Sequence, residues 1–186
     1  MIVLALHSTT PRLGVAVARN GEVLAELILP PSREHLENVT RAIKDLTETA
    51  GVRLDDVDLF GTATGPGSFS GIRVGLAVVK GLALALKKPV VGVSSLDILA
   101  RQAVGNGGPA VPVIDARRQE VYTAVFSRQA NDVTLLEGPY LKDLQDFSRL
   151  LDRYADPLVV CGDGVADALV ESRVNAMRIL VEGPHP

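Results

Sequence analysis

The most informative segment of the sequence is Gly65-Pro66-Gly67-Ser68-Phe69-Ser70-Gly71. It separates an apolar run at residues 57–64, which predicts a strand, from a second run at 72–86, which predicts a helix. A glycine-rich turn in this position can present backbone amides to an anion at the helix N-terminus. Its spacing fits neither G-x-G-x-x-G nor a P-loop, because no Lys-Ser or Lys-Thr pair follows Gly71. Two interpretations stay open: an anion-binding loop, or a tight turn that lets the helix pack closely.

The helix predicted over Ile72–Leu86 has an unusual composition. Its only charged residues are Arg73 and Lys80, and its interior contains Gly75 and Gly81. Glycine costs up to about 1 kcal/mol inside a helix, so two of them indicate close approach by another element. A helix that covers one sheet needs an apolar arc of only about 100°. This helix is apolar over most of its circumference, which predicts contacts on more than one side and favours association with another subunit.

Periodicity extends the prediction to both sides of this segment. Toward the N-terminus the pattern predicts three strands and an amphipathic helix, at Ile2–Leu6, Leu13–Ala18, Glu22–Leu29 and His35–Ala50. After the glycine-rich turn and its helix it predicts a strand at 90–93 and a helix to Ala103. The order βββαβαβα indicates an α/β protein with mixed sheets.

The second part of the chain repeats this order loosely. It predicts strands at Val111–Asp115, Glu120–Ser127, Val133–Gly138 and Leu158–Cys161, and helices at 142–154 and 163–172. The turn-forming run Asn106-Gly107-Gly108-Pro109 predicts the boundary, with one lobe at residues 1–105 and a shorter one at 106–186.

Composition narrows the class of function. The 186 residues are 47% hydrophobic and 22% charged, with a formal net charge of −3. Nucleic-acid binding through a general basic surface predicts the opposite sign. The single cysteine, Cys161, rules out an internal disulfide framework. No run of about 18 uninterrupted apolar residues occurs, so we expect no membrane partner and a cytoplasmic protein.

The residues from Gly65 to Ala77, continued by Lys80-Gly81-Leu82-Ala83, closely resemble the signature of the bacterial TsaB (YeaZ) family. The opening hairpin, the His35-led helix and Val91-Gly92-Val93-Ser94 agree in order and spacing. The resemblance implies a two-lobed actin-like (ASKHA, ribonuclease H-like) fold, with mixed sheets flanked by helices and a second lobe that is short for the family.

The resemblance also implies a function. Members of this family look like non-catalytic partners of TsaD, which transfers a threonylcarbamoyl group to adenosine 37 of tRNAs that read ANN codons. The expected role is a scaffold subunit that forms a heterodimer with TsaD and works with the ATPase TsaE, and that meets tRNA only through the complex. No cofactor or metal is expected, and weak nucleotide binding at the complex interface stays open. Alone, the chain could form a homodimer.

The alternative is an active actin-like ATPase or kinase that binds a nucleotide between the lobes. Such chemistry needs an acidic residue in the first hairpin, where this sequence has His7, a poor Mg²⁺ ligand. The family's catalytic relative would hold a metal with His-x-x-x-His on the first helix, but Val39 follows His35. Asp115, with Arg117 and Arg118, is a weaker candidate for anion binding.

A peptidase is not expected, because the sequence suggests no Ser/His/Asp set and contains no His-Glu-x-x-His. Cys161 is predicted to be a core residue at a strand end. The segment Cys161-Gly162-Asp163-Gly164 fits either a remnant of a nucleotide-binding loop or a strand-to-helix turn with Asp163 as the helix cap, and we favour the turn.

No catalytic residue is predicted. By resemblance, TsaB-like proteins meet TsaD through their first two helices. The predicted partner surface therefore comprises Leu36, Val39, Ile43, Arg73, Leu76, Val79 and Lys80.

Overall fold

A computed structural model describes residues 1–30, 38–103, 108–129, 132–154, 158–164 and 179–182. Contacts divide the chain into two compact units, Met1–Ser94 and Ser95–Pro186. We call them unit 1 and unit 2 and describe each separately.

Unit 1 contains one five-stranded sheet. Its strands are β1 (Ile2–His7), β2 (Leu13–Arg19), β3 (Glu22–Leu29), β4 (Leu59–Ala63) and β5 (Val90–Val93). They lie in the order β3-β2-β1-β4-β5, with the first two pairings antiparallel and the last two parallel. The strands predicted from the sequence are confirmed. Strands β1 and β2 are each one residue longer than expected, and β4 is shorter than its predicted range of 57–64.

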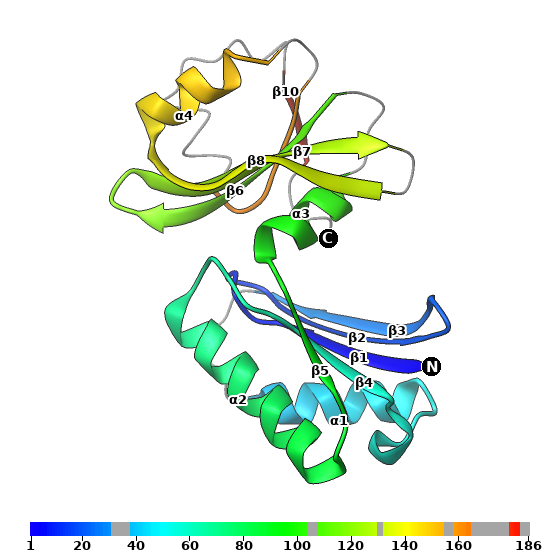
Figure 1. Cartoon of the computed structure of the whole chain (residues 1–186). Coiled ribbons are helices and arrows are strands. Elements are labelled where there is room, and N and C mark those ends of the chain that lie inside the picture. Colours follow the sequence, from blue (N-terminus) through cyan, green and yellow to red (C-terminus); the bar gives the residue numbers. More distant parts are fainter. Residues whose placement is uncertain (31–37, 104–107, 130–131, 155–157, 165–178, 183–186) are drawn as a thin grey trace. The chain divides into compact units, whose positions relative to one another are not determined.

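Helices α1 (Val39–Thr49) and α2 (Phe69–Leu86) lie on one face of this sheet, as Figure 1 shows. Helix α1 contacts β2 and β3, whereas α2 contacts mainly β4. A short 3-10 helix, η1 (Leu54–Asp56), precedes β4. The buried side chains between sheet and helices form one core, which includes Leu4, Val15, Ile43, Phe60 and Val79. The predicted start of the first helix, at His35, lies outside the described residues.

Unit 2 begins with helix α3 (Ser95–Gln102). It continues with β6 (Ala110–Arg117), β7 (Glu120–Gln129), β8 (Asp132–Asp143), α4 (Leu144–Leu151), β9 (Leu158–Cys161) and β10 (Ile179–Glu182). Strand β8 runs five residues past its predicted end, so α4 begins at Leu144 rather than residue 142. Strand β10 was not predicted. Residues 165–172 of the predicted last helix lie outside the described part.

The strands of unit 2 lie in the order β10-β9-β6-β7-β8. Strand β6 pairs antiparallel with β7 and parallel with β9. Alternation along the strands sends side chains to both faces. On one face Phe147 and Leu150 of α4 pack against Val113 and Val121. On the other face α3 packs against Ile114 and its neighbours.

The unit boundary lies at residues 94 and 95, whereas the sequence placed it at residues 105 and 106. Helix α3 accounts for the difference. Its buried residues Leu96 and Ala100 share a core with Ala110, Phe126 and Val159 of the second sheet. Helix α3 therefore belongs to unit 2.

The two sheets share one topology. Read from the outer strand of the antiparallel part, β8-β7-β6-β9-β10 repeats β3-β2-β1-β4-β5, with two antiparallel and then two parallel pairings. The loose repetition that the sequence indicated is therefore present in the fold.

Candidate functional site

The glycine-rich turn lies between β4 and α2, and its residue Ser68 makes two hydrogen bonds. The Ser68 backbone N–H donates to the carbonyl oxygen of Thr9 at 2.7 Å, and Ser68 Oγ accepts from the Gly71 N–H at 3.2 Å. Ser68 is therefore the N-cap of α2. The backbone of Gly67 has a φ of +147°, which favours glycine.

Three glycines of this segment touch the turn after β1. A Cβ atom on Gly67 would lie 2.2 Å from the Thr9 carbonyl oxygen, and one on Gly71 would lie 1.8 Å from that of Ser8. One on Gly75 would lie 2.4 Å from Ser8 Oγ. The buried Ser8 hydroxyl donates to the Gly71 carbonyl oxygen at 2.8 Å. Of the two interpretations of the motif, this geometry favours close packing of helix on hairpin.

The other helix glycine behaves differently. Nothing lies within 4 Å of the position that a Cβ atom on Gly81 would occupy. Within unit 1, close approach therefore explains Gly75 but not Gly81.

His7 lies at the end of β1, beside this packed turn. Its Nε2 atom is 3.0 Å from Thr9 Oγ1. Desolvation by burial lowers the pKa of His7. The neutral imidazole is therefore favoured at position 7, where an actin-like phosphotransferase would need a carboxylate.

Helix α2 has one buried stripe and a wide exposed surface. The stripe consists of Gly71, Gly75, Val79 and Ala83, and only 22% of the helix residues are buried. Leu84 is 81% exposed and Phe69 is 72% exposed. Length and composition alone would let α2 cross a membrane, a test that core helices of soluble proteins also pass. Arg73 and Lys80 interrupt the apolar run of α2, so the sequence contains no uninterrupted apolar stretch of spanning length here.

The structure separates the predicted partner surface into three groups. Val39, Ile43 and Val79 are at most 2% exposed and belong to the core of unit 1, so their side chains offer no surface. Arg73 and Lys80 are exposed, and Leu76 is partly exposed. Leu36 lies outside the described residues. The part of the prediction that can meet a partner directly is therefore the outer side of α2.

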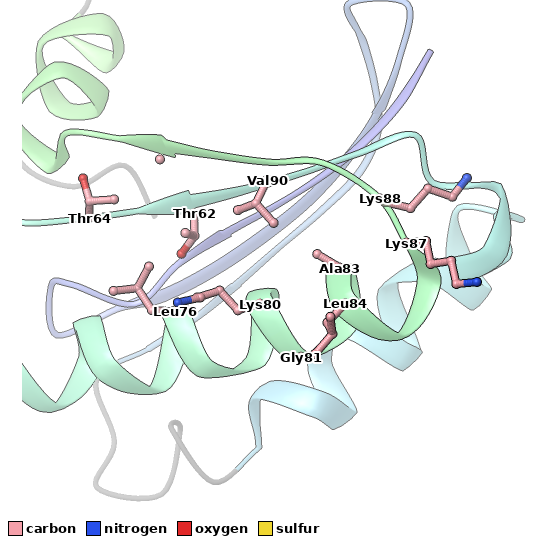
Figure 2. Close-up of a pocket in the computed structure, with 11 residues that line it drawn as sticks. Thr62, Thr64, Leu76, Lys80, Gly81, Ala83, Leu84, Lys87, Lys88 and Val90 are labelled. Atoms are coloured by element: carbon pink, nitrogen blue, oxygen red, sulfur yellow. The ribbon is translucent and has the colours of Figure 1, made fainter.

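A groove of about 720 Å³ runs along this side of α2 (Figure 2). The helix contributes Leu76, Lys80, Gly81, Ala83 and Leu84, followed by Lys87 and Lys88. Strands β4 and β5 contribute Thr62, Val90 and Gly92, and Thr64 lies directly after β4. Of these, the sequence prediction included only Leu76 and Lys80. It missed Leu84, although a leucine four residues after Lys80 lies on the same side of a helix.

Unit 2 holds a second polar cluster at the end of β6. Asp115 Oδ1 accepts from the Arg117 N–H at 2.7 Å, and its Oδ2 lies 3.1 Å from Arg117 Nη1. Desolvation by burial raises the pKa of Asp163, although a hydrogen bond with the Asp115 backbone acts in the opposite direction and lowers it. In the described part of the chain, no three His, Cys, Asp or Glu residues gather as metal ligands. Cys161 is buried, as predicted, with its Sγ 3.5 Å from the Leu99 carbonyl oxygen.

Comparison with known proteins places this fold and motif in a family. Residues 22–156 match the family model described as TsaD: tRNA N6-adenosine threonylcarbamoyltransferase. The chain is 36% identical over 135 residues to the Escherichia coli tRNA threonylcarbamoyladenosine biosynthesis protein TsaB, and 34% identical over 126 residues to that of Bacillus subtilis. These matches cover 72% and 68% of this chain. The chain spans 58% and 55% of the two relatives.

Solved structures agree with the sequence matches. A Pseudomonas aeruginosa protein described as similar to the peptidase YeaZ superposes with a TM-score of 0.82 and 28% identity, over 99% of this chain and 84% of that one. The fold is the actin-like α/β fold, with mixed sheets flanked by helices, that the resemblance implied. On the sequence matches, the glycine-rich motif and this fold together, the chain belongs to the TsaB (YeaZ) family.

Proposed function

We propose that the chain is a non-catalytic subunit that binds TsaD, the tRNA N6-adenosine threonylcarbamoyltransferase, as a heterodimer. In this role it works with the ATPase TsaE in the cytoplasm, in the formation of threonylcarbamoyladenosine at position 37 of tRNA. The names of the two bacterial relatives, which are biosynthesis proteins for this nucleoside, support the pathway.

One structural observation carries the proposal: helix α2 leaves apolar side chains uncovered. A surface helix normally turns a polar face to solvent. Here Phe69 and Leu84 are exposed, and charge is confined to Arg73 and Lys80 within the helix. Exposed apolar surface beyond what a surface helix normally carries is typical of a protein interaction site. Ala77, Gly81 and Ala85 are also exposed, and such small residues permit a partner helix to approach closely.

The residues that replace catalytic groups support a non-catalytic role. Burial lowers the pKa of His7 and so favours the neutral imidazole, which is a poor ligand for Mg²⁺. Val39, which stands where a second metal-binding histidine would be needed, is 1% exposed and contributes to the core. The buried position of Cys161 gives a peptidase no accessible nucleophile there.

The test is co-purification of the full chain with TsaD from the same organism. We expect a stable complex for the wild type and its loss in Leu84→Arg. The matched control is Leu136→Arg, because Leu136 of β8 is also an exposed leucine, at 50%, but belongs to unit 2. Val79→Arg is unsuitable as a test, because Val79 is fully buried in the core and its replacement would disrupt the fold itself. No complex with the wild type, or equal binding by Leu84→Arg, would contradict the proposal. So would steady ATP hydrolysis by the purified chain alone.

A further inference from the structure

One polar group between the sheet and α2 is buried without a hydrogen bond. The side chain of Thr62, in β4, is 3% exposed, and its Oγ1 atom has no partner among the described residues. Buried hydroxyl groups are nearly always hydrogen-bonded, because burying one without a partner costs free energy. A ligand that forms a hydrogen bond with Thr62 would recover this free energy.

Thr62 is also one of the residues that line the groove of about 720 Å³ between α2 and strands β4 and β5. Its neighbour on β5 is Gly92, which has no side chain to cover it. Figure 2 shows the Thr62 hydroxyl directed toward the helix, on the side where the Lys80 side chain ends. A molecule in the groove would therefore lie beside this hydroxyl.

The groove next to Thr62 has apolar walls. Leu76 and Ala83 of α2 lie opposite Val90 of β5, and Figure 2 shows these side chains directed into the space between helix and strand. From Leu76 to Lys87 the helix advances about 16 Å at 1.5 Å per residue. The volume of the groove lies within the range of small-molecule sites. An elongated apolar space of this kind suits a linear alkyl chain.

The charged residues that line the groove are all cations. They are Lys80, Lys87 and Lys88, and no aspartate or glutamate lines it among the described residues. Positive groups beside an apolar wall favour a ligand with an anionic head group. A carboxylate meets both requirements, because it accepts a hydrogen bond from a threonine hydroxyl and attracts a lysine ammonium group.

We propose that the groove binds a medium-chain alkyl carboxylate, with its carboxylate at Thr62 and Lys80 and its alkyl chain along Val90 and Ala83. The ligand is a free molecule rather than a membrane surface, because a bilayer would contact the exposed side of α2 and not the buried Thr62. This site goes beyond the proposed function. It is tested on the chain alone, so the result does not depend on TsaD.

The first experiment titrates decanoate into the full chain by isothermal calorimetry. We expect saturable binding at one site, and no binding of decyltrimethylammonium, which has the same alkyl chain and a cationic head group. Absence of decanoate binding overturns the proposal, as does equal binding of the two compounds. Binding of phosphatidylglycerol vesicles in place of decanoate also overturns it, because a membrane surface would then be the partner.

The second experiment replaces the two threonines of the groove. Thr62→Val keeps the shape of the side chain, so the thermal midpoint of the free chain should not fall, whereas affinity for decanoate should fall about tenfold. Thr64 is the matched control, because it also lines the groove but its hydroxyl donates to the Val93 carbonyl oxygen at 3.2 Å. Thr64→Val should bind as the wild type does. Unchanged affinity in Thr62→Val, or an equal loss in Thr64→Val, overturns the proposal.

The third experiment tests the position of the head group. Lys80→Met removes the charge and keeps an apolar side chain, and it should lower the affinity for decanoate about two- to fivefold. The control is Lys44→Met on α1, an exposed lysine of the same unit that does not line the groove. Equal affinity of the two variants would contradict a carboxylate bound at Lys80.

Discussion

Helices α4 and α2 differ in how completely they bury their apolar side chains against the sheet of their own unit. Helix α4 buries Leu144, Phe147, Leu150 and Leu151 and exposes polar residues such as Asp146 and Arg149. Helix α2 buries a narrow stripe of mostly small residues and exposes Phe69 and Leu84. The sheet of unit 2 covers the apolar side chains of α4, whereas the sheet of unit 1 leaves some apolar side chains of α2 exposed. The difference supports the proposal that α2 contacts a partner protein.

The glycine contacts, by contrast, recur in both units. A Cβ atom on Gly162, which follows β9, would lie 2.2 Å from the Val113 carbonyl oxygen of β6. Gly67 and Gly71 of unit 1 make the same kind of contact with the residues after β1. In both units the chain after the fourth strand packs closely against the first strand or the turn that follows it. What differs is the chemistry beside it: His7 in unit 1, and Asp115 with Arg117 in unit 2.

The largest predicted effect on stability distinguishes Gly71, which packs closely against the backbone, from Gly81, which has open space beside it. Gly71→Ala should destabilise the fold by about 5 kcal/mol or more, because its Cβ would meet a backbone oxygen that cannot move freely. Gly81→Ala should instead stabilise it by about 0.5–1 kcal/mol, since alanine favours a helix interior. Urea denaturation of both variants measures the difference. Equal stability of the two would show that the contact with Ser8 does not hold α2 in place.

The next effect compares buried and exposed apolar residues on the two helices. Phe147→Ala on α4 should cost about 4 kcal/mol, because it leaves a cavity in the core of unit 2. Leu84→Ala on α2 should change the stability of the free chain by less than about 0.5 kcal/mol. Thermal and urea unfolding of the chain alone measure both. A large loss in Leu84→Ala would mean that its side chain is covered within the subunit.

Loss of the N-cap of either helix should have a smaller effect on stability. Asp143 Oδ1 accepts from the Asp146 N–H at 2.8 Å in α4, and Ser68 Oγ accepts from Gly71 at 3.2 Å in α2. Asp143→Ala and Ser68→Ala should each cost about 1 kcal/mol. If Ser68→Ala costs nothing, the close packing of the glycines alone fixes the start of α2. Equilibrium unfolding is the measurement here too.

The last comparison concerns pH. The pKa of His7 is lowered by desolvation, so the unfolded chain binds the proton more tightly than the folded chain does. The contribution of His7 to stability is therefore present at neutral pH and declines as pH falls below the usual histidine value of about 6.5. Denaturation at several pH values should show a shallower decline in His7→Asn. An unchanged slope would mean that His7 titrates normally in the folded chain.

Much of the fold was predictable because strand and helix periods are strong in this sequence. The hairpin at Asn20-Gly21, the amphipathic α1 and the strand–turn–helix at Gly65–Gly71 all form as expected. The lengthened β8 and the strand β10 were not predicted. The position of α3 depends on tertiary packing against Phe126 and Val159, which local patterns do not encode.

The exposed surface of α2, where we propose that a partner docks, was only partly predictable, for a physical reason. In an amphipathic helix the sequence pattern indicates which side is buried. Helix α2 is apolar around almost its whole circumference, so the sequence does not distinguish the buried Val79 from the exposed Leu84. Only the packed structure distinguishes them, with Val79 fully buried and Leu84 exposed. The contribution of β5 to the groove depends on the order of strands in the sheet.

Carbene footprinting of the full chain, with and without TsaD from the same organism, compares the two helices in one measurement. The label reports how accessible each side chain is to solvent. Leu84 should react in the free chain and become protected in the complex, whereas Leu136 and the exposed side of α4 should react equally in both. Protection confined to unit 2, or a Leu84 that reacts equally in the free chain and in the complex, would contradict a role for α2 as the docking helix.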